Sequence, residues 1–268
     1  MTWHQRMDRL YWWMCNQIVP GQKNSQYAYL NTLEHCLTPA DRWLDMGCGH
    51  TLVPAWIKQA QARQKQLINT AGEIIGIDCD DVSLQKNQCH HRTVKGSLYD
   101  LPFEDQSFDL LTANMVVEHI DDPDALFSQV KRVLKPGGNF IFHTPNKWSP
   151  LTCLAAVFPQ KLKNKIVNLL DGRAEADVFP THYHINTASQ IDALAKAHGL
   201  QVVEIKMVNS SADTAMLGPL VIVELLYMRL TNHNGLRNYR TNIVTVLQRP
   251  IEKTQLLPSR NIIMAKVA

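Results

Sequence analysis

The sequence predicts an α/β fold built around a doubly wound, mostly parallel sheet of seven strands. Three observations support this prediction. Residues 41–144 alternate short apolar runs with longer amphipathic stretches, which is how parallel strands joined by crossover helices appear in a sequence. The first apolar run leads directly into a turn with two glycines. The chain has 268 residues, of which 45% are hydrophobic and 19% charged, enough to bury the core of one large domain that carries an inserted cap.

Most of the expected sheet lies within residues 41–144. The last helix of this region is the best defined, because Pro123 and acidic residues stand at its start and Pro136-Gly137-Gly138 follows its end. Its apolar residues fall on one face. We expect strands at Trp43–Met46, Glu73–Asp78, Arg92–Lys95, Phe108–Ala113 and Asn139–Thr144, and helices near Val53–Lys65, Asp80–Cys89 and Asp124–Leu134.

The alternation stops after Thr144. Residues 145–186 mix Pro, Lys, Asn and aromatic residues without a clean period, which is typical of an inserted cap, and we expect this cap to face the substrate. Residues 187–268 then complete the sheet. The expected elements there are a helix at Thr187–His198, a strand at Gln201–Met207, helices near Leu220–Leu230 and Leu236–Leu247, and a final strand at Asn261–Val267.

Charge and cysteine content restrict the class of partner and compartment. The formal net charge of +3 is too small to indicate a nucleic-acid partner. The six cysteines are scattered without a C-x-x-C pair, and the histidines lack carboxylates at helical spacing, so we expect free thiols and no metal site. An export signal is not recognisable at the N-terminus. These features predict a cytoplasmic protein.

The longest apolar run, Leu220 to Leu230, is too short to span a bilayer and is broken by Glu224 and Arg229. A stripe of apolar residues within it predicts a helix that faces the core: Leu220, Val223, Leu226 and Leu230. The alternative is a peripheral contact with a membrane, because four arginines lie close by: Arg229, Arg237, Arg240 and Arg249.

The most informative segment is WLDMGCGHT, residues 43–51. Here an apolar strand ends in Asp45 and runs directly into Gly47-Cys48-Gly49. Glycines at a strand-to-helix turn let the backbone approach a ligand closely, because no Cβ blocks it and a positive φ costs little. Two glycines alone are a weak signal for any one ligand. The third glycine of a nicotinamide or flavin fingerprint is missing, so dinucleotide binding is disfavoured.

The next strand, EIIGID, ends in Asp78. A carboxylate at this place can accept hydrogen bonds from both ribose hydroxyls of a nucleoside. Asp78 follows Gly49 by 29 residues, more than the ~20 that separate the corresponding groups of dinucleotide folds. The position of the carboxylate at the strand end therefore indicates a nucleoside, although its distance in sequence from the glycine turn is longer than in dinucleotide folds.

Taken in order, these motifs resemble those of the class I S-adenosylmethionine-dependent methyltransferases, in particular the enzymes that act on small molecules. The resemblance covers residues 42–146 strongly and residues 179–205 more loosely. It is carried by LDMGCG (44–49), GIDCD (76–80), LPFEDQSFDLLTANMVVEHI (101–120) and LKPGGNFIFHTPN (134–146). It implies a Rossmann-like single domain, residues 1–268, with N-terminal lid helices in residues 1–40, a cofactor-binding core in 41–144, and S-adenosylmethionine as cofactor.

The resemblance also implies a role for each residue of the cofactor site. Asp45 and the backbone of Gly47, Cys48 and Gly49 would hold the methionine part. Asp78 would bind the ribose, with Cys79, Ser97 and the backbone N–H of Leu98 at the adenine. The backbone carbonyl of Asn114 would meet the amino group. A cofactor with an ammonium group, a sulfonium and a diol requires acceptors at two strand ends with little bulk between them.

Two positions depart from the family pattern. Thr51 stands where the family usually has Gly, and Ser97 where it usually has an Asp that reads the adenine. A hydroxyl there accepts a weaker hydrogen bond than a carboxylate does. These departures keep open the alternative of a non-catalytic cofactor-binding or interaction module that retains the fold. A nucleic-acid methyltransferase is disfavoured, because Asn114-Met115-Val116-Val117 replaces the NPPY-type motif.

Transfer of a methyl group from a sulfonium is an in-line displacement, so the protein chiefly has to orient a small-molecule acceptor and exclude water. A general base is needed when the acceptor is a hydroxyl or an acidic carbon. His119 and His143 are the candidates, because they stand at the carboxyl ends of adjacent expected strands. A structural role is the alternative for both. The sequence leaves the acceptor, the methylated atom and the oligomeric state open.

Overall fold

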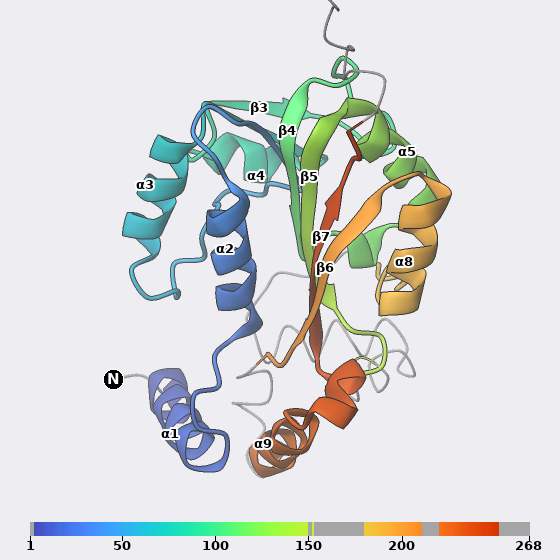
Figure 1. Cartoon of the computed structure of the whole chain (residues 1–268). Helices are drawn as coiled ribbons and strands as arrows, with labels where there is room; N and C mark the ends of the chain where they lie inside the picture. The colour runs from blue at the N-terminus through green and yellow to red at the C-terminus, as the bar shows by residue number, and fades with distance from the viewer. Residues whose placement is uncertain (1–2, 150–151, 153–179, 211–219, 252–268) are drawn as a thin grey trace, which may run out of the picture.

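A computed structural model describes residues 3–149, 152, 180–210 and 220–251, and within them one sheet of seven strands forms the centre (Figure 1). The strand order is β3-β2-β1-β4-β5-β7-β6. The strands are β1 (Arg42–Met46), β2 (Glu73–Asp78), β3 (Arg92–Lys95), β4 (Phe108–Asn114), β5 (Leu134–Pro145), β6 (Gln201–Val208) and β7 (Asn242–Gln248). Strands β1 to β5 are parallel, whereas β7 runs antiparallel to both of its neighbours. The expected α/β fold with a mostly parallel sheet is confirmed.

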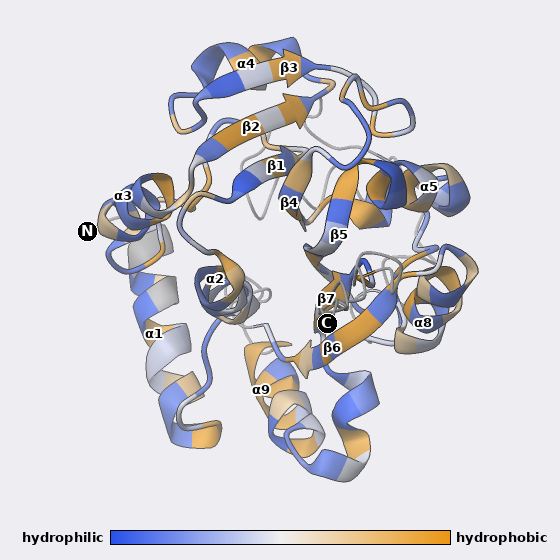
Figure 2. Cartoon of the chain, turned by 45° about the horizontal axis from the view of Figure 1, so that its top comes forward, coloured by the Kyte–Doolittle hydropathy of each residue, from blue (hydrophilic) through white to orange (hydrophobic). Residues whose placement is uncertain are grey.

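Helices cover both faces of the sheet (Figures 1 and 2). The helices of the described residues are α1 (Trp3–Ile18), α2 (Ser25–Cys36), α3 (Ala60–Thr70), α4 (Asp81–Lys86), α5 (Pro123–Val133), α8 (Ala188–Ala197) and α9 (Leu220–Thr231), with short 3₁₀ helices η1 (Val117–His119) and η3 (Asn234–Tyr239). Helices α1 and α9 lie beyond one end of the sheet and pack against each other. Because both faces are covered, the central strands are buried along nearly their whole length, as the apolar runs of the sequence predict.

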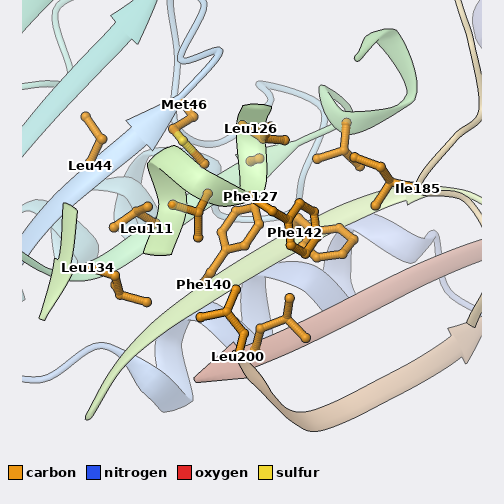
Figure 3. Packing of buried hydrophobic residues seen from close by; sticks show 14 of the residues in the cluster. Leu44, Met46, Leu111, Leu126, Phe127, Leu134, Phe140, Phe142, Ile185 and Leu200 are labelled. Carbon is orange, nitrogen blue, oxygen red and sulfur yellow. The ribbon is translucent and has the colours of Figure 1, made fainter. Parts of the chain in front are cut away.

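The core consists of two large clusters, one on each face of the sheet. The cluster beneath α5 and α8 is rich in phenylalanine, with Phe127 of α5 packed edge-on against Phe140 of β5 at a ring distance of 6.3 Å (Figure 3). The cluster on the other face joins Leu30 and Leu33 of α2 to Trp43 of β1. Helix α2 packs on β5 and β7 and shares this cluster with β1, the strand that leads into the glycine turn.

The sequence features that predict the start of α5 are present in the structure. Asp122 caps the helix by accepting a hydrogen bond from the N–H of Ala125 at 3.0 Å, and Pro123 occupies the first turn. Two other helices are shorter than expected. Helix α3 spans Ala60–Thr70 instead of Val53–Lys65, because turns and a bend fill residues 55–59, and α4 ends at Lys86 after its cap at Asp80.

The expected helix at Leu236–Leu247 is wrong. Residues 242–248, NIVTVLQ, form β7, which pairs with β5 on one side and β6 on the other. Its β-branched residues suit a buried strand, and pairing along both edges outweighs the helical spacing of the apolar residues. The expected strand Asn261–Val267 and most of the expected cap, residues 150–151 and 153–179, lie outside the described residues.

The expectation for the stripe on α9 is also wrong. Leu220, Val223, Leu226 and Leu230 are all exposed. The opposite face is buried against α1, where Tyr11 donates a hydrogen bond of 2.7 Å to Glu224. Figure 2 shows the hydrophobic residues along α9. The half-buried Arg240 and the buried Arg249 both donate to backbone carbonyls of the fold.

In the part of the chain that the structure describes, every helix is too short or too polar to cross a membrane. The peripheral membrane contact stays a prediction.

Replacement of Phe127 by alanine tests the core beneath α5. The ring is fully buried, so its loss removes the contact with Phe140 and leaves a cavity. We expect the free energy of unfolding, measured with urea, to fall by about 3–5 kcal/mol. The control Val203→Ala removes an exposed side chain of β6 and should cost less than about 1 kcal/mol. A loss at Phe127 as small as that at Val203 would contradict this packing.

Candidate functional site

Two adjoining pockets lie at the carboxyl ends of β1, β2 and β4. The first pocket has a volume of about 360 Å³ and the second about 530 Å³, and both are lined by Gly47 and Asn114. Every residue expected to bind the cofactor lines one of them. The first takes Asp45, Cys48 and Gly49, and the second takes Asp78, Cys79, Ser97 and Leu98. The structure therefore brings together residues that are spread over 70 positions of the sequence.

Asp45 is the nearly buried carboxylate of the first pocket. Its Oδ1 accepts a hydrogen bond of 2.5 Å from the hydroxyl of Thr112, which in turn accepts one of 2.7 Å from Nε1 of Trp43. Its Oδ2 lies 3.1 Å from Nε2 of His90. Because both oxygens have a polar partner inside the protein, the carboxylate is held in one orientation at the pocket wall.

Asp78 joins the glycine turn to the end of β2. Its Oδ2 accepts from the N–H of Gly49 and its Oδ1 from the N–H of Asp80, both at 2.9 Å. The N–H groups of Gly47 and Cys48 donate to the carbonyl of Ile77. These N–H groups thus donate within the protein, so a ligand would have to contact other atoms of the turn. Each carboxylate oxygen retains capacity for a second donor such as a ribose hydroxyl.

The two glycines of the turn are required for different reasons. Both have a positive φ, +65° at Gly47 and +50° at Gly49. A Cβ at Gly47 would lie 2.4 Å from Cγ2 of Val116, so the chain itself excludes any larger residue. A Cβ at Gly49 would meet no protein atom within 4 Å. Since Gly49 lines the first pocket, this open space is a cradle that fits a bound group.

The second pocket offers neutral polar groups around Ser97 and Leu98. The Oγ of Ser97 accepts a hydrogen bond of 3.2 Å from the N–H of Tyr99, which leaves its own proton and a further lone pair for a ligand. Burial and the neighbouring Asp78 raise the pKa of Cys79, so its thiol is neutral at pH 7. Uncharged groups of this kind suit an uncharged heterocyclic ring.

His119, in η1, lines the second pocket. Its Nδ1 lies 2.7 Å from the carbonyl oxygen of Pro180, and a carbonyl only accepts, so Nδ1 carries the proton. Burial lowers the pKa of His119, which favours the neutral ring with its lone pair on Nε2. This is the protonation state that a general base requires.

His143, in β5, occupies a different environment. The ring is buried, stacks on Tyr29 and hydrogen-bonds through Nδ1 to Asn114 at 2.9 Å and through Nε2 to Ser25 at 3.0 Å. Burial lowers its pKa to about 3. It does not line either pocket described above, and its contact with Asn114 favours a positioning role. Its role as a base stays a prediction.

Two partners of Asp45 were missed by sequence reasoning. Thr112 pairs directly with Asp45 in the parallel register of β1 and β4, so the expected strands contained a signal for it. His90 comes from the segment between α4 and β3, 45 positions from Asp45, and nothing in its spacing indicates the contact.

Comparison with known proteins shows which proteins this chain resembles. A family model described as a methyltransferase domain matches residues 22–205. An uncharacterized methyltransferase of Schizosaccharomyces pombe is 29% identical over 150 residues, 53% of this chain and 51% of that protein. A demethylmenaquinone methyltransferase of Staphylococcus saprophyticus is 32% identical over 142 residues, 51% of this chain and 56% of that protein. The chain thus spans about half the length of these relatives.

A solved structure shares the fold. The geranyl diphosphate C-methyltransferase of Streptomyces coelicolor, solved with Mg²⁺, geranyl diphosphate and S-adenosyl-L-homocysteine, superposes with a TM-score of 0.53 over 83% of this chain and 77% of that protein. The two sequences are 16% identical, so this likeness concerns the fold alone.

Alanine at Gly49 tests whether the cradle is a binding surface. The added Cβ has the strain of a positive φ but no clash, so we expect the free energy of unfolding to fall by about 1 kcal/mol. The affinity for S-adenosylhomocysteine, measured by calorimetry, should fall much more, by about tenfold or above. Gly21→Ala is the matched control, because Gly21 also has a positive φ with open space but lies outside both pockets. Equal affinities of the two variants for S-adenosylhomocysteine would show that Gly49 is not part of the binding site.

The pH dependence of stability tests the buried His143. Its pKa is near 3 in the folded protein and about 6.5 in the unfolded chain, so the unfolded state takes up the proton first as the pH falls. Stability that is fully present above pH 6.5 is therefore lost between pH 6.5 and 3. We expect wild type to lose about 3 kcal/mol more than His143→Gln between pH 7 and 4 in urea unfolding. If the free energy of unfolding fell equally with pH in the two proteins, the lowered pKa of His143 would be contradicted.

Proposed function

Since the chain belongs to the class I family of S-adenosylmethionine-dependent methyltransferases, we propose that it transfers a methyl group from this cofactor to a small-molecule acceptor by in-line displacement. The observation that carries the proposal is the placement of Asp45 and Asp78. They end neighbouring strands, and they line two pockets that meet at Gly47 and Asn114.

We assign each part of the cofactor to groups that line the two pockets. Asp45 would bind the ammonium of the methionine part, and Asp78 the ribose hydroxyls. Cys79, Ser97 and Leu98 would surround the adenine. Asn114 stands between the pockets, where its backbone carbonyl would meet the amino group. The cofactor supplies an electrophilic methyl group on a sulfonium.

The contribution of the chain is orientation and, where the acceptor carries a proton, removal of that proton. Alignment of two reacting groups supplies about 7 kcal/mol or more of a barrier. His119 is our proposed base, because it lines the second pocket with its lone pair on Nε2. Within this proposal the cap of residues 145–186 selects the acceptor, and the enzyme acts in the cytoplasm.

The names of relatives suggest which acceptors to try first. The Staphylococcus relative is named for demethylmenaquinone, and a relative from Hahella chejuensis for ubiquinone biosynthesis. Quinone precursors with a free hydroxyl or ring carbon are therefore the first acceptors to test. A non-catalytic module is the alternative function, and it predicts cofactor binding without turnover of any acceptor. Thr51, which motivated it, donates within its own loop to the carbonyl of Val53.

The Asp45→Asn variant tests the proposed function directly. An amide cannot pair with an ammonium as a carboxylate does, and a hydrogen bond to a charged group is worth about 1.5–3 kcal/mol. We expect S-adenosylhomocysteine to bind wild type in calorimetry and to bind the variant about 10- to 100-fold more weakly. The control is Asp192→Asn, which removes an exposed carboxylate of α8 and should leave the affinity unchanged. Wild type that binds no cofactor would overturn the proposal.

A further inference from the structure

The side chain of His90 is fully buried behind Asp45. It lines neither of the two pockets described above, yet its Nε2 lies 3.1 Å from Oδ2 of Asp45. Gly76 of β2 makes room for it, because a Cβ there would lie 3.0 Å from Cδ2 of His90 and 2.6 Å from Sγ of Cys48. The ring is therefore packed against the strand that supports the glycine turn.

The other ring nitrogen of His90 faces Asn87, whose amide orientation is determined by its other partners. The side-chain nitrogen of Asn87 donates to the carbonyl of Gly49 at 2.8 Å. Its oxygen accepts from the backbone N–H groups of Cys89 at 3.0 Å and of His90 at 3.2 Å. The atom that lies 2.9 Å from Nδ1 of His90 is thus this oxygen, which can only accept a hydrogen bond.

Both ring nitrogens of His90 consequently face oxygen atoms that accept, one of an amide and one of a carboxylate. A neutral imidazole has one N–H and would present a lone pair to one of these oxygens. The imidazolium donates to both. It also balances the charge of Asp45, which is costly to bury unless it is paired and hydrogen-bonded.

We propose that His90 is a positioning residue, an imidazolium that holds the carboxylate of Asp45 in the orientation that receives the amino group of the cofactor. The inference rests on the proposed function, because that function places the amino group at Asp45. His90 holds Oδ2 from behind while Thr112 holds Oδ1, so the remaining lone pairs of the carboxylate are directed into the first pocket. Asn87, whose oxygen faces the other nitrogen of this ring, also donates to the carbonyl of Gly49.

The test compares two ligands that differ in the part that Asp45 would bind. S-adenosylhomocysteine carries the amino acid, whereas 5′-methylthioadenosine keeps the nucleoside and the thioether and lacks the amino group. In His90→Leu we expect the Kd of S-adenosylhomocysteine to rise about 10- to 100-fold, since a charged hydrogen bond to Asp45 is lost. The Kd of 5′-methylthioadenosine should change by less than about threefold, because the ribose and adenine contacts remain.

His90→Gln and His91→Gln complete the comparison. Glutamine at position 90 keeps one donor for Asp45, so we expect an affinity between those of wild type and His90→Leu. His91 is the adjacent histidine, and its Nδ1 accepts a hydrogen bond from the N–H of Ile74 at 2.9 Å instead of touching Asp45. His91→Gln should leave the ratio of the two Kd values at the wild-type level.

The outcomes separate the inference from the proposed function. If wild type binds neither ligand, the proposed function fails. If wild type binds both, then equal losses of both ligands in His90→Leu would show a merely structural role and overturn the inference, as would unchanged affinities. The protonation state is measured in wild type without any substitution: the ¹⁵N spectrum of the His90 ring should show two protonated nitrogens. A lone pair at either nitrogen would overturn the inference even where His90→Leu does not fold.

Discussion

The parallel register of β1 with β2 and β4 is the constraint on which the site depends. Asp45 pairs with Gly76 on one side and with Thr112 on the other. This register sets the hydroxyl of Thr112 against the carboxylate and sets the end of β2 beside the glycine turn. Side chains alternate between the two faces of a strand. A shift of the register by one residue would therefore turn Asp45 away from Thr112 and move the end of β2 away from the glycine turn.

The site also shows two opposite ways of burying a histidine. His143 is surrounded by groups that can both donate and accept, a serine hydroxyl and two amides, so the neutral ring is satisfied and its pKa falls to about 3. His90 faces two acceptors, one of them ionised. The same side chain thus serves as a neutral bridge beside Asn114 and as a counter-ion behind Asp45, and the neighbours decide which.

Much of the cofactor end of the site could be predicted from the sequence. Asp45, the glycine turn and Asp78 stand at the ends of apolar runs, and the fold rule that parallel strands end at one edge is enough to bring them together. The residues that hydrogen-bond to these carboxylates were harder to predict. His90 follows a short helix in a segment without periodicity, and its contact arises only from packing over Gly76.

The second half of the sheet was harder to predict for a related reason. The residues of β7 have apolar spacing compatible with a helix, and only the two neighbouring strands decide between the states. On α9 the buried side carries Val221, Leu225 and Met228, which pack against α1, together with Glu224, whose carboxyl group accepts a hydrogen bond from Tyr11. A polar residue is a poor marker of the buried face in a sequence, so the apolar stripe on the other side was misleading.

The part of the site around His119, where we propose that the acceptor binds, is built differently from the part around Asp45 and Asp78. The 3₁₀ helix η1 is joined to residues 180–183 by hydrogen bonds: the backbone carbonyl of Glu118 accepts from the N–H groups of His182 and Tyr183, and the ring of His119 donates to the carbonyl of Pro180. Strand ends carry the groups that we propose bind the cofactor. Beside the proposed base, backbone hydrogen bonds attach a separate segment of the chain. Backbone hydrogen bonds place few demands on side chains, so residues 180–183 can vary in sequence while keeping their position. The strand ends carry recognisable sequence motifs and residues 180–183 do not, which is why the sequence indicates the methyl donor more clearly than the compound that would receive the methyl group.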